Sequence, residues 1–185
     1  MAEQADETVY EARFGFTVRG VLVVVISVVF VVLGVVFDVP LFLQILLIVF
    51  FGGGGLVFLA QMLSRRVALR VDGTGITLGG SPLHAYRRTT AVVPWSDITA
   101  VVLFSQKVGY GNSLHYVGVR RREDAPDLPG LPGSGMRGAN ERLIPHVPQE
   151  VVAASRPING WSLDRAQLKE VVAHHAPDVQ VQDLG

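Results

Sequence analysis

The fold is decided by residues 20–63, which read GVLVVVISVVFVVLGVVFDVPLFLQILLIVFFGGGGLVFLAQML. The first part, Gly20–Phe37, is apolar apart from one serine and two glycines. At about 1.5 Å per residue, a helix of this length nearly crosses a hydrocarbon core of about 30 Å. Because lipid offers the backbone no hydrogen-bond partners, the run must form a helix despite its many valines. We therefore predict a transmembrane helix. A cleaved signal peptide is the competing interpretation, but the preceding segment is acidic and a second apolar run follows.

The second apolar run, Leu41–Leu63, has Gln44 and Gln61 as its only polar side chains. The link Asp38–Pro40 is so short that the two helices must form an antiparallel hairpin. Four glycines, Gly52–Gly55, allow a neighbouring helix to approach closely. We favour packing against the first helix of the same chain over packing against another protein. A broken helix that lines a transport path would normally carry an ionisable residue, and neither run contains one.

Positive charge flanks the hairpin on one side only. Arg13 and Arg19 precede it, Arg65 and Arg66 follow it, and the turn between the runs has no lysine or arginine. Because basic residues stay on the cytoplasmic side of a membrane, we expect both termini to face the cytoplasm. The predicted location is the inner (plasma) membrane, crossed twice.

The composition of the remainder excludes some partners and some chemistry. Residues 64–185 contain fourteen basic and eleven acidic residues, interspersed along the chain. A nucleic-acid-binding domain would usually show a concentrated basic stripe, so nucleic acid is not expected as a partner. The absence of cysteine excludes disulfides, thiolate metal sites and a cysteine nucleophile.

The periodicity changes after the hairpin. Residues 67–71 alternate between apolar and other side chains, and Asp72–Gly75 supply turn residues before Ile76–Leu78. This pattern predicts a β-hairpin. Further strands are expected in a series of β-branched and aromatic segments, namely residues 84–93, 98–104, 114–119, 141–144 and 151–155.

Two features complete the domain. Residues 125–140 are dense in proline and glycine and are expected to form a long surface loop. A helix is predicted to begin at Ser162 or Asp164 and to end before Pro177. Its apolar face comprises Leu168, Val171, Val172 and His175. Short strands followed by one amphipathic helix suggest a bent sheet or open barrel plugged by that helix.

Three segments carry a resemblance to a known family. Leu69–Ile76 (LRVDGTGI), Val93–Ile98 (VPWSDI) and the helix over Ser162–Ala176 resemble the bacterial pleckstrin-homology-like (PH-like) domains found behind membrane hairpins. The resemblance covers about residues 67–177 and implies a PH-like fold with a C-terminal helix. The expected organisation is an N-terminal cytoplasmic segment (1–19), a transmembrane hairpin (20–63), a PH-like β domain (64–177) with its loop at 125–140, and a tail (178–185).

Signs of catalysis or cofactor binding are weak. Gly133–Gly138 fits the phosphate-cradling pattern GxGxxG, but no strong strand precedes it and no helix signal follows, so a glycine-rich loop is expected. No nucleophile elbow or paired carboxylates appear, so the protein is not expected to be an enzyme. The histidines lack metal-ligand spacing, and neither a metal nor a cofactor is predicted. These histidines are His84, His115, His146, His174 and His175.

Aromatic and basic residues supply the remaining candidates. Trp95 follows Pro94 at the start of an apolar strand, which favours a core anchor over a ligand platform. The candidate lipid or partner contacts are Arg65, Arg66, Arg70, Arg87 and Arg88. Such a basic face gains about 1 kcal/mol per arginine against anionic lipid. The alternative is that these arginines serve only topology and solubility.

Two functional hypotheses follow, with an enzyme ranked third. The first is a non-enzymatic, membrane-tethered interaction module that binds a protein partner or itself at the cytoplasmic face, where tethering raises its effective concentration. The second is a sensor of anionic lipid headgroups that uses Arg87 and Arg88.

Overall fold

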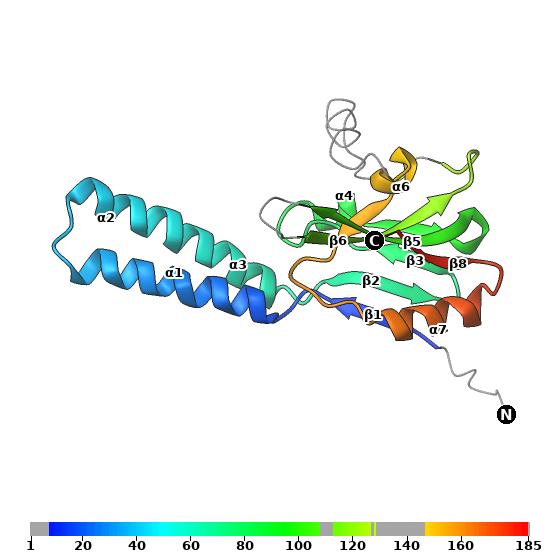
Figure 1. Ribbon diagram of the computed structural model, residues 1–185, viewed down its shortest axis with the longest axis horizontal. Helices are drawn as coiled ribbons and strands as arrows, with labels where there is room; N and C mark the ends of the chain where they lie inside the picture. The colour runs from blue at the N-terminus through cyan, green and yellow to red at the C-terminus, as the bar shows by residue number, and fades with distance from the viewer. Residues whose placement is uncertain (1–7, 108–112, 127, 129–146, 185) are drawn as a thin grey trace.

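The computed structural model describes residues 8–107, 113–126, 128 and 147–184. The first apolar run forms α1 (Val18–Val36). The second forms α2 (Leu41–Leu47), a π-helical turn η1 (Ile48–Gly52) and α3 (Gly53–Leu63). Figure 1 shows the two runs side by side and antiparallel, projecting from the β domain. The predicted apolar helical hairpin is confirmed, and both helices are long and apolar enough to cross a membrane.

Two of the four glycines lie against the first helix, and a Cβ built on Gly52 would lie 3.6 Å from Val31 Cγ2 in α1. A Cβ built on Gly55 would lie 2.8 Å from the Cβ of Ser27 in α1, whereas the Cβ positions of Gly53 and Gly54 have no atom within 4 Å. The π-helical turn lies directly before these glycines, which is where a local widening of the helix shifts the faces that follow. Packing against the first helix of the same chain is therefore confirmed for Gly52 and Gly55 and does not extend to Gly53 or Gly54.

The described residues of the β domain form two four-stranded sheets. The first has the order β1-β2-β3-β4 and consists of β1 (Tyr10–Arg13), β2 (Val67–Asp72), β3 (Gly75–Leu78) and β4 (Ala91–Pro94). The second has the order β7-β6-β5-β8 and consists of β7 (Ser155–Pro157), β6 (Ser113–Arg121), β5 (Ile98–Lys107) and β8 (Gln180–Asp183). All pairings are antiparallel except β5 with β8.

Helix α7 (Arg165–His175) closes the main core. Leu168, Val171 and Val172 are buried among residues from both sheets, so the predicted apolar face is confirmed, with His175 at its partly exposed end. The helix begins as predicted, because the side chain of Asp164 accepts hydrogen bonds from two backbone amides of the first turn. The described residues also form the short helices α4 (Tyr86–Thr89) and α6 (Gln149–Ala153) and the 3-10 turn η2 (Trp95–Asp97).

The predicted β-hairpin is confirmed, and its turn depends on two residues. Asp72 Oδ1 accepts hydrogen bonds from the Thr74 amide at 2.9 Å and from the Thr74 hydroxyl at 2.6 Å. Thr74 and then Arg70 therefore lower the pKa of Asp72 to about 2. Gly75 has a φ of +150°, and a Cβ at this position would collide with the carbonyl oxygen of Val93 in the neighbouring strand. Glycine is required there.

Two predicted strands are wrong. Residues 84–93 contain a strand only from Ala91, because Ala85 adopts a left-handed conformation (φ 47°) that starts the turn of α4. Residues 151–155 are helical up to residue 153, and this short helix buries Val151 and Val152 against the outer face of β5. The expected strand at 141–144 and most of the expected loop at 125–140 lie outside the described residues.

Two strands lie in segments that the sequence did not assign to the β domain. β1 lies inside the segment 1–19 that was expected to precede the domain, and it pairs with β2 from Tyr10↔Val71 to Arg13↔Val67. β8 lies inside the expected tail and pairs in parallel with β5. Both strands are only four residues long, and three of the four residues of β8 are polar. Their pairing with β2 and β5 therefore identifies them as strands, and their own sequences do not.

Candidate functional site

The two ends of the helical hairpin are connected to neighbouring strands of the same sheet, β1 and β2. Residues 14–17 link β1 to α1, and residues 64–66 link α3 to β2. The two links are joined by a hydrogen bond from the Phe14 amide to the Arg66 carbonyl at 2.9 Å. The Gly15 amide donates to the Gly160 carbonyl at 2.9 Å, which ties the loop after β7 to the same place. The base of the hairpin is thus attached to β1 and β2 and is hydrogen-bonded to the loop after β7.

Three of the five candidate arginines meet at this base. Arg66, Arg87 and Arg88 line a shallow depression together with Leu83, Ala85 and Tyr86. The Arg66 guanidinium carbon lies 5.0 Å from the centroid of the Tyr86 ring, and the Tyr86 hydroxyl donates to the Val67 carbonyl at 2.8 Å. We call Arg66, Arg87 and Arg88 the arginine surface. All three side chains are exposed, and among the described residues no ion pair involves them.

The other two arginines lie elsewhere. Arg70 points to the acidic residues of its own sheet, with its Nε 2.8 Å from Asp72 Oδ2 and its Nη1 3.4 Å from Glu11 Oε2. Its charge is therefore balanced within the domain. Arg65 is exposed in a left-handed conformation (φ 46°) and does not line the depression. The sequence predicted one basic face formed by all five arginines. In the structure only Arg66, Arg87 and Arg88 line the same depression, whereas Arg70 is paired with acidic residues.

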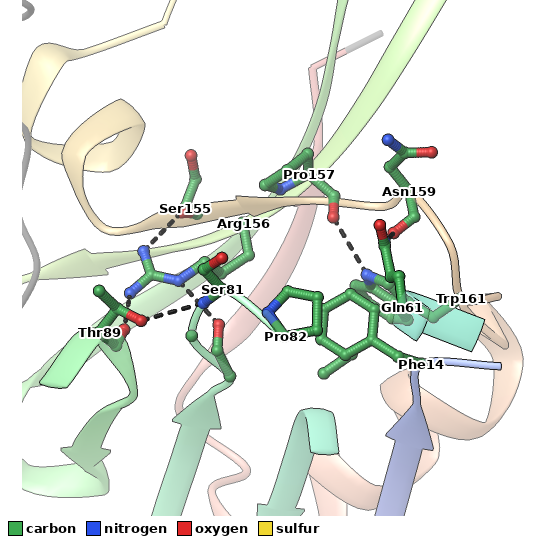
Figure 2. Close-up of a pocket in the computed structure, with 13 residues that line it drawn as sticks. Phe14, Gln61, Ser81, Pro82, Thr89, Ser155, Arg156, Pro157, Asn159 and Trp161 are labelled. Atoms are coloured by element: carbon green, nitrogen blue, oxygen red, sulfur yellow. Dashed lines mark hydrogen bonds between the residues drawn. The ribbon is translucent and has the colours of Figure 1, made fainter. Parts of the chain in front are cut away.

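A second cavity, of about 400 Å³, lies beside the base of the hairpin (Figure 2). It is bounded by the ends of β1 and β3, by α3 and by the segment that contains β7. In Figure 2 the polar groups around Arg156 gather at one end, and the rings of Phe14 and Trp161 lie at the other. Its lining residues are Phe14, Gln61, Ala68, Gly79, Gly80, Ser81, Pro82, Thr89, Ser155, Arg156, Pro157, Asn159 and Trp161. We call this the Arg156 cavity.

Arg156 is held rigidly in this cavity by backbone oxygens. Its Nε donates to the Gly79 carbonyl at 3.0 Å, its Nη1 to the Ser155 carbonyl at 2.9 Å and its Nη2 to the Thr89 carbonyl at 2.8 Å. Burial lowers the pKa of this arginine from its usual value. No acidic residue is among the described residues that line the cavity. Arg156 was not among the residues predicted from the sequence, because a lone arginine before a proline carries no signal that would single it out.

The hairpin contributes directly to the wall of the Arg156 cavity. Gln61 of α3 reaches the carbonyl oxygen of Asn159, with its Nε2 at 3.5 Å. Gly160 allows this approach, because it has a φ of +75° and a Cβ there would collide with Gln61 Nε2. Trp161 is 4% exposed and its Nε1 donates to the Pro157 carbonyl at 3.0 Å, so the segment after β7 is packed on both sides.

The conspicuous tryptophan of the sequence has a structural role. Trp95 is partly buried against the main core, and its Nε1 donates to the Asp72 carbonyl at 2.9 Å. The predicted core anchor is thus confirmed. The GxGxxG segment at 133–138 and His146 lie outside the described residues.

The remaining histidines do not form a metal site with acidic neighbours. In the part of the chain that the structure describes, no group of three or more His, Asp or Glu residues is positioned to hold a metal ion. The rings of His174 and His175 meet edge to face at 4.9 Å between centroids. His175 Nε2 lies 2.6 Å from the Thr8 carbonyl oxygen, which links the end of α7 to the chain before β1.

No protein-family model, curated protein or solved structure matches this chain. The PH-like classification therefore stays a prediction from the three segments named above.

Proposed function

We propose that this protein is a non-enzymatic module of the cytoplasmic membrane, anchored by its two apolar helices, whose β domain contacts anionic lipid through the arginine surface. The observation that carries the proposal is the convergence of Arg66, Arg87 and Arg88 on one exposed depression at the base of the hairpin. Arg66 follows Leu63, the last residue of α3, by only three positions. With the hairpin in a bilayer, Arg66 would lie at the depth of the headgroups, and the shared depression would hold Arg87 and Arg88 beside it.

Exposure of the hairpin supports the anchor. In the second apolar run only Gly55 and Met62 are buried, and in α1 only Gly20, Ser27 and Gly34 are. In water, this much exposed apolar surface would drive association, whereas lipid accommodates it without cost. The flanking charges support cytoplasmic termini and location in the plasma membrane, as the sequence predicts.

Electrostatics supports the lipid contact. Each cation near an anionic membrane surface contributes about 1 kcal/mol, and the contribution decreases within a Debye length of about 8 Å. Because the hairpin already anchors the chain, this energy would set the orientation of the β domain. The expected consequence is a domain that lies against anionic bilayers and tilts freely over neutral ones.

The hypothesis of a protein partner keeps one specific support. β4 is an edge strand of its sheet, and its outward residue Val92 is 60% exposed. An open edge with an apolar side chain can pair with an extended segment of another protein or of a second copy. We rank this second, because the strand has only four residues.

Photocrosslinking of the full-length chain separates these candidates. A photoreactive residue at Leu83, which lines the depression, is expected to give lipid adducts in cells and in phosphatidylglycerol nanodiscs. The same residue at Val92 tests the protein partner. Arg87→Gln with Arg88→Gln should reduce the Leu83 lipid adducts severalfold, and Arg122→Gln, which neutralises an exposed arginine beyond the end of β6, should not.

The outcomes are distinct. Lipid adducts at Leu83 that are insensitive to Arg87 and Arg88 would contradict the lipid proposal. A discrete protein adduct at Val92 without lipid adducts at Leu83 would establish the partner hypothesis in its place. The full chain is necessary, because a fragment that starts at Arg65 lacks β1 and leaves one edge of β2 without its partner strand.

A further inference from the structure

The Arg156 cavity presents a fixed positive charge. Three different segments supply the carbonyl oxygens that hold the guanidinium, which are the end of β3, the turn of α4 and β7 itself. An arginine held in this way cannot turn out into solvent without breaking all three hydrogen bonds. A guanidinium has five N–H donors. Among the described residues, three of them have these carbonyl partners, and two remain for a further acceptor.

Among the residues that the structure describes, none lining the cavity carries a charge opposite to that of Arg156. Carbonyl oxygens stabilise a cation through their dipoles but contribute no net charge. Buried charges in proteins are usually balanced by a counter-ion, because the penalty for removing an ion from water is several kcal/mol. Every other described residue that lines this cavity is neutral. An anion entering it would therefore gain an attraction that water screens only in part.

The lining suits a small oxyanion. Ser81 lies beside the arginine in Figure 2 and provides a neutral side-chain donor, and its amide is already held by Thr89 Oγ1 at 3.0 Å. Arginine presents its donors in a planar fork that matches phosphate oxygens. A volume of about 400 Å³ exceeds the size of one phosphate group and lies in the usual range for small-ligand sites.

The geometry points to a binding site for a phosphate group in the Arg156 cavity, with the guanidinium as its charged ligand and Ser81 beside it. Two sources share this chemistry, a phospholipid headgroup and a soluble phosphate. Gln61 of α3 lies in the cavity wall, which places the site next to the apolar hairpin. The lipid source rests on the proposed membrane anchor. The soluble source is independent of it, and neither source requires the arginine surface.

The competing explanation is that Arg156 only joins the three segments that accept its hydrogen bonds. Substitution of Arg156 itself would not separate the two explanations, because the loss of three hydrogen bonds would also destabilise the domain. Ser81 offers a cleaner test, since its side chain is exposed and lines the same cavity. Ser81→Asp supplies an internal counter-ion for Arg156, and Ser81→Asn is its neutral control of nearly equal size.

The test uses the full-length protein in two arms. In non-ionic detergent without phospholipid, inorganic phosphate is titrated against chloride at constant ionic strength, and tryptophan fluorescence reports on Trp161 in the cavity wall. In phosphatidylglycerol nanodiscs, native mass spectrometry counts the phospholipid retained after release of the protein. The wild type and S81N should bind in at least one arm, and S81D should bind at least about tenfold more weakly.

Each result has one meaning. A phosphate response that S81D loses assigns a soluble phosphate, and retained lipid that S81D loses, without a phosphate response, assigns a headgroup. Equal behaviour of S81D and S81N in both arms, including the absence of binding in both, overturns the site. Arg87→Gln with Arg88→Gln is expected to leave these results unchanged, so the failure of the lipid contact proposed above is distinguishable from the failure of this site.

Discussion

The hairpin and the β domain place their apolar residues in opposite ways. In the hairpin the large apolar side chains point outward, as Leu46 does with 49% of its surface exposed. In the β domain they point inward, and Leu168 of α7 is completely buried. The same residue type thus stabilises one region through the solvent around it and the other through its packing. Whether a leucine side chain stabilises the folded β domain therefore depends on whether protein or lipid surrounds it.

The largest expected effect tests this comparison with one substitution in two places. Leu168→Ala removes a fully buried side chain and should lower the free energy of unfolding of the β domain by about 2–5 kcal/mol. Leu46→Ala in the hairpin should change the same quantity by less than about 0.5 kcal/mol, since surface substitutions lie in this range. The measurement is denaturant unfolding in lipid nanodiscs followed by near-UV circular dichroism. An equal loss of unfolding free energy in both variants would contradict the different roles of apolar side chains in the two regions.

A smaller effect is expected where the hairpin does pack closely. Gly55→Leu places a side chain where even a Cβ lies 2.8 Å from Ser27, so the two helices must separate at a cost of about 1–3 kcal/mol. Gly54→Leu is the matched control, because its Cβ position has no atom within 4 Å. Thermal unfolding in nanodiscs compares the two variants. A destabilised Gly54→Leu variant would indicate that a second copy covers this face.

The smallest of the three effects is a pH dependence that belongs to the β domain. The pKa of Asp72 is lowered to about 2, first by the Thr74 hydroxyl and then by Arg70. A lowered carboxyl pKa stabilises the fold above the unfolded pKa of about 4, and this contribution is lost as the pH falls through the folded pKa. Asp72→Asn should therefore cost about 1–2 kcal/mol at pH 6 and progressively less between about pH 4 and pH 2.

The check is a series of denaturant unfolding curves from pH 6 to pH 2. The exposed Asp178 provides the control, since Asp178→Asn should show no comparable pH-dependent loss. A constant difference between wild type and Asp72→Asn across this range would show that the carboxylate charge is not the stabilising feature. The Thr74 hydrogen bonds would then act through their geometry alone.

Prediction from the sequence succeeded where the pattern is local. Short stretches of sequence predict three elements. An apolar run predicts the helical hairpin, turn residues predict the β2–β3 turn, and apolar residues at helical spacing predict α7. It failed over residues 84–90, where Ala85 in a left-handed conformation starts a helical turn, and at residues 151–153, where Val151 and Val152 face a separate core. β-branched residues favour strands, but burial on a short helix outweighs that preference.

The candidate site residues were also predicted only in part. The sequence placed Arg66, Arg87 and Arg88 near the hairpin base, and the structure joins them on one depression. It grouped Arg70 with them, although Asp72 and Glu11 balance its charge. It did not indicate Arg156, whose partners Gly79 and Thr89 lie 77 and 67 residues away. Such partners follow from strand order and not from any neighbouring residue.

By itself the sequence determined the two apolar helices, the β-hairpin that follows them and the amphipathic helix near the end, because periodicity and turn chemistry act over a few residues. The tertiary structure alone shows that β1 and β8 are strands, that Gly52 and Gly55 but not Gly53 or Gly54 lie against α1, and that Arg156 is enclosed by carbonyl oxygens. These features depend on contacts between residues far apart in the chain, which form when the sheets pair and the core packs.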